Sequence, residues 1–321
     1  MSASMIEVRV ARKRVEATDI CTFELVATRG APLPAFSAGS HVDVHLPGGI
    51  TRQYSLCNDP AESHRYLIGV LKDAATRGGS ASMHDLVGEG DTLQISTPKN
   101  HFALAHDAER HLLLAGGIGV TPILCMAERL AIVDAAFEMH YCTRSLARTA
   151  FHARVTGSSL ADKVQFHFDD GPAEQKLDID RLLARPQPGT HVYVCGPTGF
   201  MEAVLGAARA AGWPEAQLHF EYFSAEVVKT ASDGSFEVRL ASSGKCVVVG
   251  NDQTVVEALR AAGIEIQTSC EQGVCGTCLT RVLEGTPDHR DMYLMPDEQA
   301  RNDQFMPCCS RAKSAVLVLD L

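Results

Sequence analysis

Two different spacings of apolar residues divide the chain. Near the N-terminus the spacing is two residues, as in 6–10 and 41–46, which is typical of short strands with one buried face. Further strands are expected at 66–71 and 92–95. Because these strands are short and closely spaced, we predict an antiparallel β-barrel for this part of the chain.

Strands alternate with helices in the next part. The apolar run 112–115 is typical of a strand buried on both faces, and similar strands are expected at 138–142, 164–168 and 191–195. A helix is expected over 198–211, because apolar residues recur on one face before a glycine and a proline end it. This alternation predicts an α/β doubly wound domain.

The last part of the chain contains a hairpin, a helix and a closing strand. A polar stretch at 226–235 is typical of a linker. Strands at 236–240 and 246–249 precede a short helix that begins with a capping box at 254–257. With a final strand at 315–319, this order predicts a small α+β domain of the β-grasp type.

Four of the eleven cysteines have a spacing typical of iron ligands. Three fall close together and the fourth follows after 29 other residues: Cys270, Cys275, Cys278 and Cys308. This is the ligand spacing of a plant-type [2Fe–2S] cluster, which needs four thiolates, three of them from one tight loop. Gly273 and Gly276 allow the backbone to wrap closely and to direct N–H groups at the sulfurs. A one-electron centre here requires an electron source upstream in the chain.

A zinc site or buried structural thiols would also explain these cysteines. Zinc sites usually combine two C-x2-4-C pairs, and only one such pair is present, at Cys275 and Cys278. A disulfide framework is disfavoured, because the number of cysteines is odd and they are spread over 321 residues. Cys309 adjoins Cys308 and is a second candidate for the fourth ligand, although the spacing favours Cys308.

Charge and hydropathy argue against several classes of protein. A formal net charge of −10 argues against a nucleic-acid partner. No apolar run of about 18 residues is present, so no membrane span is expected. Residues 1–15 lack the apolar core of a signal peptide. A reducing cytoplasmic location fits both the free thiols and a thiolate-held cluster.

Two short segments of the expected barrel suit a flavin. In RQYS at 52–55 the aromatic ring can stack on an isoalloxazine, the serine hydroxyl can reach its N5 edge, and the arginine can bind a phosphate. In RGGS at 77–80 the glycines allow close approach, and a following helix would direct its positive end at an anion. Each segment alone is more simply explained by strand packing or a plain loop. Together, in one domain, they favour flavin mononucleotide.

Two loops of the α/β part suit a nicotinamide dinucleotide. GGIGVTP at 116–122 joins a buried strand to a helix, for which Thr121 is expected as the N-cap and Pro122 as the first residue. The proline replaces the third glycine of the dinucleotide fingerprint, yet a helix N-terminus still favours a pyrophosphate. Cys195 is expected at the carboxyl end of a strand, where open α/β sheets bind ligands. Without these neighbours, a small buried thiol is the simpler interpretation of Cys195.

In this order, the motifs resemble the phthalate dioxygenase reductase family, which includes the vanillate demethylase reductases. The matching stretches cover essentially the whole chain: RQYSLCNDP at 52–60, RGGS at 77–80, PKNHF at 98–102, AGGIGVTP at 115–122, YVCGP at 193–197, SCEQGVCGTC at 269–278, LEGTPDHRD at 283–291 and CSRAKSAVLVLDL at 309–321. The resemblance implies an FMN-binding barrel at 1–107, an NAD-binding domain at 108–225, a linker at 226–235 and a [2Fe–2S] ferredoxin domain at 236–321. No adenine-binding insertion is evident in the barrel, which favours FMN over FAD.

The resemblance also implies roles for single residues. Those expected at the flavin and its phosphate are Arg52, Tyr54, Ser55, Arg77, Gly79 and Ser80. Those expected at the nicotinamide are Gly117, Thr121, Cys195 and Gly196. Phe223 looks like the aromatic that covers the flavin until nicotinamide displaces it, with Tyr222 as a rival one residue away. The residues expected to act at the reacting atoms are Ser55, Thr121, Cys195 and Phe223.

The coenzyme is expected to be NADH. Asp169 and Asp170 follow a strand, at a place where a carboxylate would meet the adenosine ribose and repel a 2′-phosphate. Thr143 and Arg144 are expected at the same pocket. Arg144, like Arg148, offers a cation that would instead favour NADPH.

The expected function follows from a mismatch of electron number. NADH delivers two electrons as a hydride, a [2Fe–2S] cluster accepts one, and a flavin can do both. We expect an NADH-dependent reductase component of a Rieske-type aromatic-ring oxygenase or demethylase, with that oxygenase as the protein partner. The alternatives are a general NADH:acceptor reductase acting on ferric chelates or quinones, and a non-catalytic redox carrier.

Overall fold

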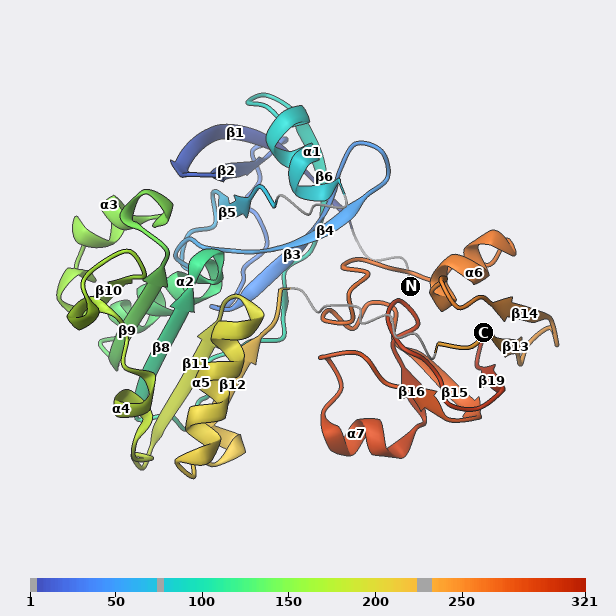
Figure 1. Ribbon diagram of the computed structural model, residues 1–321. Coiled ribbons are helices and arrows are strands. Elements are labelled where there is room, and N and C mark those ends of the chain that lie inside the picture. Colours follow the sequence, from blue (N-terminus) through green and yellow to red (C-terminus); the bar gives the residue numbers. More distant parts are fainter. Residues whose placement is uncertain (1–4, 74–77, 224–232) are drawn as a thin grey trace. The chain divides into compact units, whose positions relative to one another are not determined.

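The computed structural model describes residues 5–73, 78–223 and 233–321, and Figure 1 shows them as a ribbon. The chain forms two compact units, residues 1–223 and 224–321. The first unit contains the barrel and the α/β sheet, and the second contains the ferredoxin-like sheet. Arg77 and residues 226–232 of the expected linker lie outside the described residues.

The first unit begins with an antiparallel barrel. Its elements are β1 (Met5–Ala17), β2 (Ile20–Ala27), β3 (Ser40–His45), β4 (Thr51–Ser55), β5 (Tyr66–Leu71), α1 (Gly79–Leu86), β6 (Thr92–Ser96) and β7 (Lys99–Asn100). The strands neighbour one another in the order β4–β3–β6–β1–β2–β5, and a bridge between Leu56 and Ile68 joins the two edges. Alternate residues of β1 and β3, such as Val8 and Val42, are buried in one apolar core, as the two-residue spacing predicts.

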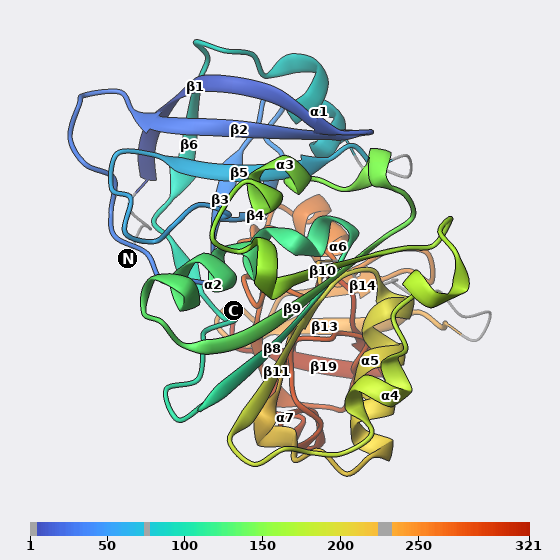
Figure 2. The ribbon, with the colours of Figure 1, turned by 90° about the vertical axis from the view of Figure 1, so that its left-hand side faces the viewer.

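A parallel sheet forms the rest of the first unit. Its strands are β8 (Arg110–Gly116), β9 (Ala136–Thr143), β10 (Val164–Phe168), β11 (Thr190–Cys195) and β12 (Leu218–Glu221), in the order β10–β9–β8–β11–β12. The helices are α2 (Val120–Ile132), α3 (His152–Thr156), α4 (Ile179–Leu183) and α5 (Thr198–Ala210). Short 3-10 turns lie at Gly117–Gly119, Leu146–Arg148, Ala161–Lys163, Ala173–Gln175 and Glu215–Gln217. Figure 2 shows this sheet with α5 and α4 beside β11.

Both faces of the parallel sheet are covered by helices. On β8, Leu113 and Ala115 pack with α2, whereas Leu112 and Leu114 pack with α4 and α5. This is why residues 112–115 of the strand are apolar without interruption rather than at alternate positions. The prediction of a doubly wound domain is confirmed. Within the described ranges, no helix combines the length and apolar character needed to cross a bilayer.

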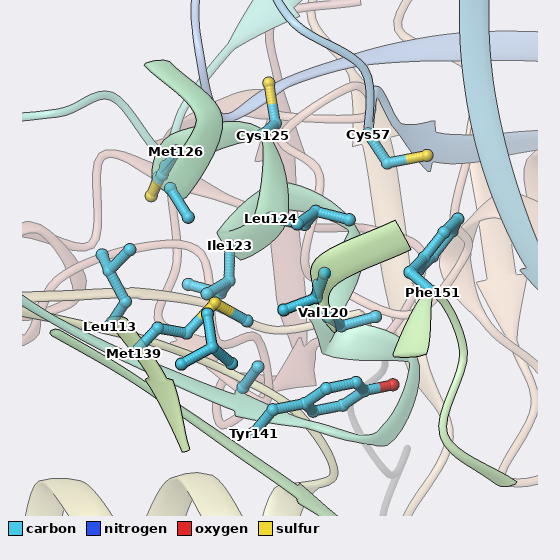
Figure 3. Packing of buried hydrophobic residues seen from close by; sticks show 14 of the residues in the cluster. Cys57, Leu113, Val120, Ile123, Leu124, Cys125, Met126, Met139, Tyr141 and Phe151 are labelled. Carbon is cyan, nitrogen blue, oxygen red and sulfur yellow. The ribbon is translucent and has the colours of Figure 1, made fainter. Parts of the chain in front are cut away.

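Helix α2 packs against both the sheet and the barrel. Figure 3 shows Ile123, Leu124 and Met126 of this helix among the sheet residues Leu113 and Met139. Each of these five side chains is fully buried, and burial of one such side chain contributes about 1.5–3 kcal/mol.

Two further contacts tie α2 to the barrel. The Cys125 thiol donates a hydrogen bond to the carbonyl of Asn58 at 3.2 Å. The methyl group of Thr121 lies against Gly69 of β5, where a Cβ would overlap it. Barrel and sheet therefore share one core within the first unit.

The expected start of this helix, Pro122, is wrong by two residues. Thr121 is not its N-cap, because the 3-10 turn Gly117–Gly119 leads directly into a helix that begins at Val120. The Thr121 hydroxyl instead donates to the carbonyl of Ile118 at 3.1 Å.

The second unit contains a five-stranded mixed sheet. Its elements are β13 (Phe236–Leu240), β14 (Cys246–Val249), α6 (Val255–Ala261), β15 (Thr280–Glu284), β16 (Pro287–Asp288), α7 (Pro296–Arg301), β17 (Gln304–Phe305), β18 (Arg311–Ala312) and β19 (Val316–Leu319). The sheet order is β14–β13–β19–β15–β17, with β13 and β19 parallel and β13 and β14 antiparallel. Thr254 and Glu257 form the expected capping box of α6. The hairpin, the helix and the closing strand of the predicted β-grasp domain are thus confirmed.

Candidate functional site

Strand β4 and the start of α1 form a cradle in the barrel. The Arg52 side chain crosses Gly79 so closely that a Cβ there would overlap the Arg52 Cγ and Nε atoms. Gly78 precedes the helix with φ of 92°, a conformation that favours glycine. The Ser80 hydroxyl accepts a hydrogen bond from the Asp73 N–H at 3.2 Å. The structure therefore brings together three of the expected phosphate and flavin residues, Arg52, Gly79 and Ser80.

Tyr54 supports the assignment of this cradle to a polar cofactor. Its hydroxyl is buried, and it makes no hydrogen bond within the part of the chain that the structure describes. A buried hydroxyl without a partner costs about 1–3 kcal/mol, which a ligand atom at this position would recover. The residues present fit a flavin mononucleotide.

A partly buried acid and a buried histidine lie beside Ser55. The Ser55 hydroxyl donates to Oε2 of Glu221 at 3.5 Å, and Nδ1 of His41 lies 4.0 Å from the other oxygen, Oε1. His41 is the direct cross-strand neighbour of Ser55, whereas Glu221 comes from the last strand of the parallel sheet. Sequence reasoning missed both residues. The available signal was a lone carboxylate within the apolar segment that ends at Phe223.

Burial shifts the protonation of this pair toward the neutral forms. Loss of solvation raises the pKa of Glu221 to about 8, opposed by the Ser55 hydrogen bond. Loss of solvation also lowers the pKa of His41 to about 4, opposed by the charge of Asp43. Near neutral pH the site thus holds one proton on the Glu221 carboxyl beside a neutral imidazole.

Replacing Glu221 with glutamine should change how stability depends on pH. Glu221 binds its proton more tightly in the folded chain than at its ordinary value of 4.5, so its contribution is present below pH 4.5 and is lost as the pH rises through about 8. We expect the Tm difference between Glu221→Gln and the wild type to rise across this window, measured by thermal melts from pH 5 to 9. Parallel pH profiles for the two proteins would contradict the raised pKa.

The two nicotinamide loops contact each other directly. A Cβ at Gly119 would overlap the backbone of Cys195 and Gly196, and one at Gly116 would overlap Pro197 and Phe200. Only glycine therefore permits this approach of the β8 and β11 loops. Gly117 has a φ of 52° and no neighbour within 4 Å of its Cβ position, so its backbone is open to a ligand.

Cys195 and Thr121 are less accessible than the sequence suggested. Cys195 ends β11 between Ala115 and Glu221, and its thiol is fully buried. Burial raises the pKa of this thiol, and the nearby carboxylate of Glu221 adds to the increase. Thr121 is 1% exposed, and its methyl group faces the barrel. Both side chains shape the loops that surround the expected nicotinamide position.

The expected adenosine residues come together at the ends of β9 and β10. Thr143 pairs with Phe168, and the N–H of Asp170 donates to the carbonyl of Arg144 at 3.1 Å. The Thr143 hydroxyl is buried and bonded to Thr149 at 2.7 Å, so it fixes the loop. Asp170 and Arg144 are exposed beside each other.

Phe223 and Tyr222 lie on opposite faces of the parallel sheet. Phe223 packs against the core shared by α2 and the barrel, whereas Tyr222 packs with α5. Only Phe223 is on the side of the sheet that packs against the barrel, which favours it over Tyr222 as the flavin-covering aromatic.

The cluster loop of the second unit brings the four expected thiols together. Hydrogen bonds involving the Cys275 thiol and then the Cys308 thiol hold the pKa of Cys270 far below its usual range. Cys278 in turn contacts Cys308. Backbone N–H groups donate to the sulfurs, from Gln272 to Cys270 at 3.3 Å and from Thr277 to Cys275 at 3.5 Å.

The glycines of this loop have the conformation that the motif predicts. Gly273 and Gly276 have φ of 75° and 72°, and a Cβ at either one would overlap a neighbour, Cys309 or Tyr293. In the described part of the chain, no three His, Cys, Asp or Glu side chains converge as the ligands of one metal ion do. A [2Fe–2S] cluster instead distributes four thiolates over two irons. Four cysteine thiols with backbone N–H donors at the sulfurs fit such a cluster.

Cys308 and Cys309 differ in what their thiols contact. Cys308 contacts the Cys270 and Cys278 sulfurs, and also the Cys309 thiol. The Cys309 sulfur lies against Gly273, and its thiol donates to the Met306 carbonyl at 3.7 Å. This geometry favours Cys308 as the fourth ligand.

A nucleotide-binding α/β sheet joined to a flavin cradle, together with a four-thiol loop, defines a flavin- and iron–sulfur-dependent oxidoreductase. Comparison with known proteins agrees with this class. Residues 238–313 match the 2Fe-2S iron-sulfur cluster binding domain family. Residues 95–218 match the N-terminal domain of dimethylamine monooxygenase subunit DmmA-like proteins.

Full-length relatives give the family. The chain is 58% identical over 318 residues to vanillate O-demethylase oxidoreductase of Pseudomonas putida, covering 99% of this chain and 100% of that protein. It is 41% identical over 317 residues to phthalate dioxygenase reductase of Burkholderia cepacia, covering 98% and 97%. A solved phthalate dioxygenase reductase, described as modular for electron transfer from pyridine nucleotides to [2Fe-2S], has a TM-score of 0.79 and 40% identity, covering 99% and 98%. The chain belongs to the phthalate dioxygenase reductase family.

Membership in this family confirms the expected activity. The chain is an NADH-dependent flavin iron–sulfur oxidoreductase and the reductase component of an oxygenase system. The prediction of an oxygenase as protein partner is confirmed at this level.

Proposed function

We propose that this reductase serves a Rieske-type oxygenase that removes a methyl group from an aromatic methoxy acid, in the cytoplasm. The observation that carries the proposal is 58% identity to a vanillate O-demethylase oxidoreductase. The match covers 99% of this chain and 100% of that protein. The cytoplasmic location is supported by eleven cysteines that are all free thiols.

The barrel residues hold the flavin in this proposal. Bound there, FMN supplies a ring that accepts a hydride and returns electrons one at a time. Arg52 offers a forked cation to the phosphate, and the N-terminus of α1 directs backbone N–H groups from Gly79 and Ser80 toward it. Tyr54 packs against the ring and gains a partner for its hydroxyl.

The sheet residues position the coenzyme. Gly117, together with the contact between Gly119 and Cys195, leaves space for the nicotinamide beside Ser55. Phe223 excludes water from this space until the coenzyme enters. Oε2 of Glu221 accepts a hydrogen bond from the Ser55 hydroxyl and so helps to orient it.

The cluster ligands that we propose are Cys270, Cys275, Cys278 and Cys308. The N–H donors from Gln272 and Thr277 stabilise negative charge on the sulfurs and raise the reduction potential of a bound cluster. The cluster delivers single electrons to the oxygenase.

Removing Asp170 should weaken discrimination against NADPH. The carboxylate faces the expected ribose position, where its repulsion of a 2′-phosphate is worth about 1 kcal/mol in exposed surroundings. We expect Asp170→Ala to raise kcat/KM for NADPH about fivefold and to leave that for NADH within about twofold. Asp162→Ala, which removes an exposed aspartate from the turn Ala161–Lys163, is the matched control. A wild type that already prefers NADPH would contradict the assignment.

Reconstitution with a purified vanillate-type oxygenase tests the proposal. We expect NADH oxidation to be coupled to formaldehyde release from a methoxybenzoate, at close to one formaldehyde for each NADH. If such oxygenases release no formaldehyde, but NADH-dependent reduction of ferric chelates is fast, the result would favour the general acceptor reductase.

A further inference from the structure

The loop that carries Asp170 is fixed to the sheet at its far end by a histidine side chain. This loop follows β10 and ends in the 3-10 turn Ala173–Gln175. Nδ1 of His167, a residue of β10, lies 2.8 Å from the carbonyl oxygen of Gln175. The ring of His167 therefore sets where the loop returns to the sheet.

This contact reaches Asp170 through the residue that follows it. A Cβ at Gly171 would overlap the side-chain oxygen of Gln175, so the Gln175 side chain packs directly against Gly171. On its other side, the Asp170 N–H donates to the carbonyl of Arg144 at 3.1 Å. Displacement of Gln175 would remove the support on one side of Asp170 only, and the loop would shift without coming apart.

The carbonyl of Gln175 determines where the hydrogens of two neighbouring rings lie. A carbonyl oxygen can only accept, so Nδ1 of His167 carries a hydrogen. A neutral imidazole has one N–H, which leaves a lone pair on Nε2 of His167. Nδ1 of His140 lies 3.0 Å from that nitrogen and donates its hydrogen to it. Each donor in the chain from His140 to His167 to Gln175 thus meets an acceptor.

His140 supports the ring of His167 from the interior of the domain. His140 is 4% exposed, and the two rings stack with their centroids 5.2 Å apart. Its Nε2 atom is buried and meets no hydrogen-bond partner among the described residues. An apolar side chain would avoid the cost of this unpaired nitrogen, so the bond made by Nδ1 explains a histidine here. Burial, and to a lesser extent His167, lowers the pKa of His140 to about 4, so its ring is neutral at neutral pH.

We propose that His167, held by His140, is a positioning residue for coenzyme specificity, which keeps the Asp170 carboxylate where it opposes the 2′-phosphate of NADPH. The inference rests on the proposed function, because the adenosine ribose must lie beside Asp170. His167 acts through the loop and does not touch the coenzyme. Loss of its Nδ1 donor relaxes the discrimination between the coenzymes and leaves the reaction at the flavin unchanged.

Two substitutions of His167 in the holoprotein separate the hydrogen bond from the shape of the ring. Phenylalanine keeps a ring that can stack but cannot donate, whereas asparagine places an N–H as many bonds from the backbone as Nδ1. We expect His167→Phe to raise kcat/KM for NADPH about threefold, a part of the about fivefold change expected on loss of the carboxylate itself. His167→Asn should restore the wild-type discrimination. In both variants kcat with NADH and ferricyanide should stay within about twofold of the wild type, because the flavin reaction is untouched.

A double-mutant cycle tests whether His167 acts through the carboxylate. If it does, the double variant His167→Phe/Asp170→Ala has the NADPH kcat/KM of Asp170→Ala alone, about fivefold above the wild type. Independent effects would multiply to about 15-fold, and this result would overturn the inference. His106→Phe, at an exposed histidine of the loop before β8, is the matched control and should behave as the wild type.

The remaining outcomes separate the inference from the proposed function. Wild-type discrimination in His167→Phe, or an equal change in His167→Phe and His167→Asn, would overturn the positioning role. Wild-type discrimination in Asp170→Ala would instead contradict the proposed coenzyme position, on which the inference depends. If His167→Phe does not fold, nitrogen-15 NMR of the wild type decides: hydrogens on Nδ1 of both His140 and His167 support the inference, and a bare Nδ1 on His167 overturns it.

Discussion

Replacing Cys275 with serine should abolish electron delivery to an oxygenase and leave the flavin reaction intact. The variant lacks one of the four thiolates that hold the cluster. Substitution of a residue that only supports a metal ligand already lowers metal affinity or activity roughly 10–100-fold, and loss of a ligand itself should cost at least as much. We therefore expect NADH-dependent oxygenase turnover to fall more than about 100-fold. Reduction of ferricyanide, which can take electrons from the flavin directly, should stay within about twofold of the wild type.

Cys309 provides the matched control for this experiment. It is buried next to Cys308, but its thiol donates to a backbone carbonyl. Cys309→Ser should keep the cluster absorption and the oxygenase turnover, whereas Cys308→Ser should behave like Cys275→Ser. Oxygenase turnover that survives in Cys275→Ser would show that electrons bypass the cluster.

Replacing Gly119 with alanine should have the second-largest effect. The new Cβ would overlap the Cys195 carbonyl and the Gly196 nitrogen, which are backbone atoms and cannot rotate away. We expect the free energy of unfolding to fall by about 1–3 kcal/mol, the usual cost of overpacking. We also expect the two loops to separate by about 1 Å, which would misplace the bound nicotinamide. Because a misplacement of about 1 Å can lower the rate about 100-fold, kcat/KM for NADH should fall by about this factor.

A second glycine gives the control for the Gly119 variant. Gly199 lies exposed in α5, and a Cβ there would meet nothing within 4 Å. Gly199→Ala should therefore keep the wild-type kcat/KM and gain about 0.5–1 kcal/mol, as alanine favours a helix over glycine. Equal losses of kcat/KM in both variants would contradict the contact between the loops.

The elements of the fold could be predicted because each one carries its own spacing of apolar residues. The two-residue spacing at Val8 and Val10 of β1 and the continuous apolar run in β8 are local features, and each matches the observed burial. In β3 the apolar residues alternate, but the polar residues between them are buried as well. The cluster loop is local as well, since three ligands and two glycines lie within one short segment. Such features are visible without knowing which strands become neighbours.

The residues that sequence reasoning missed are brought together only by the tertiary structure. Ser55 and Glu221 are 166 residues apart, and their contact depends on how the edge of the barrel meets the last strand of the parallel sheet. Neither His41 nor Glu221 belongs to a motif. Thr121 was misjudged for the opposite reason, because a favourable capping residue was overridden by the 3-10 turn that precedes it.

The central claim is tested most directly by mixing the purified chain with NADH under anaerobic conditions. Optical and electron paramagnetic resonance spectra are recorded at the same time. The claim is that one polypeptide converts a hydride into single electrons through a flavin. We predict one FMN, two irons and two sulfides per chain, with flavin bleaching first and the signal of the reduced cluster following it. Cluster reduction by NADH in a flavin-free preparation, or a chain that binds iron without any flavin, would contradict the account.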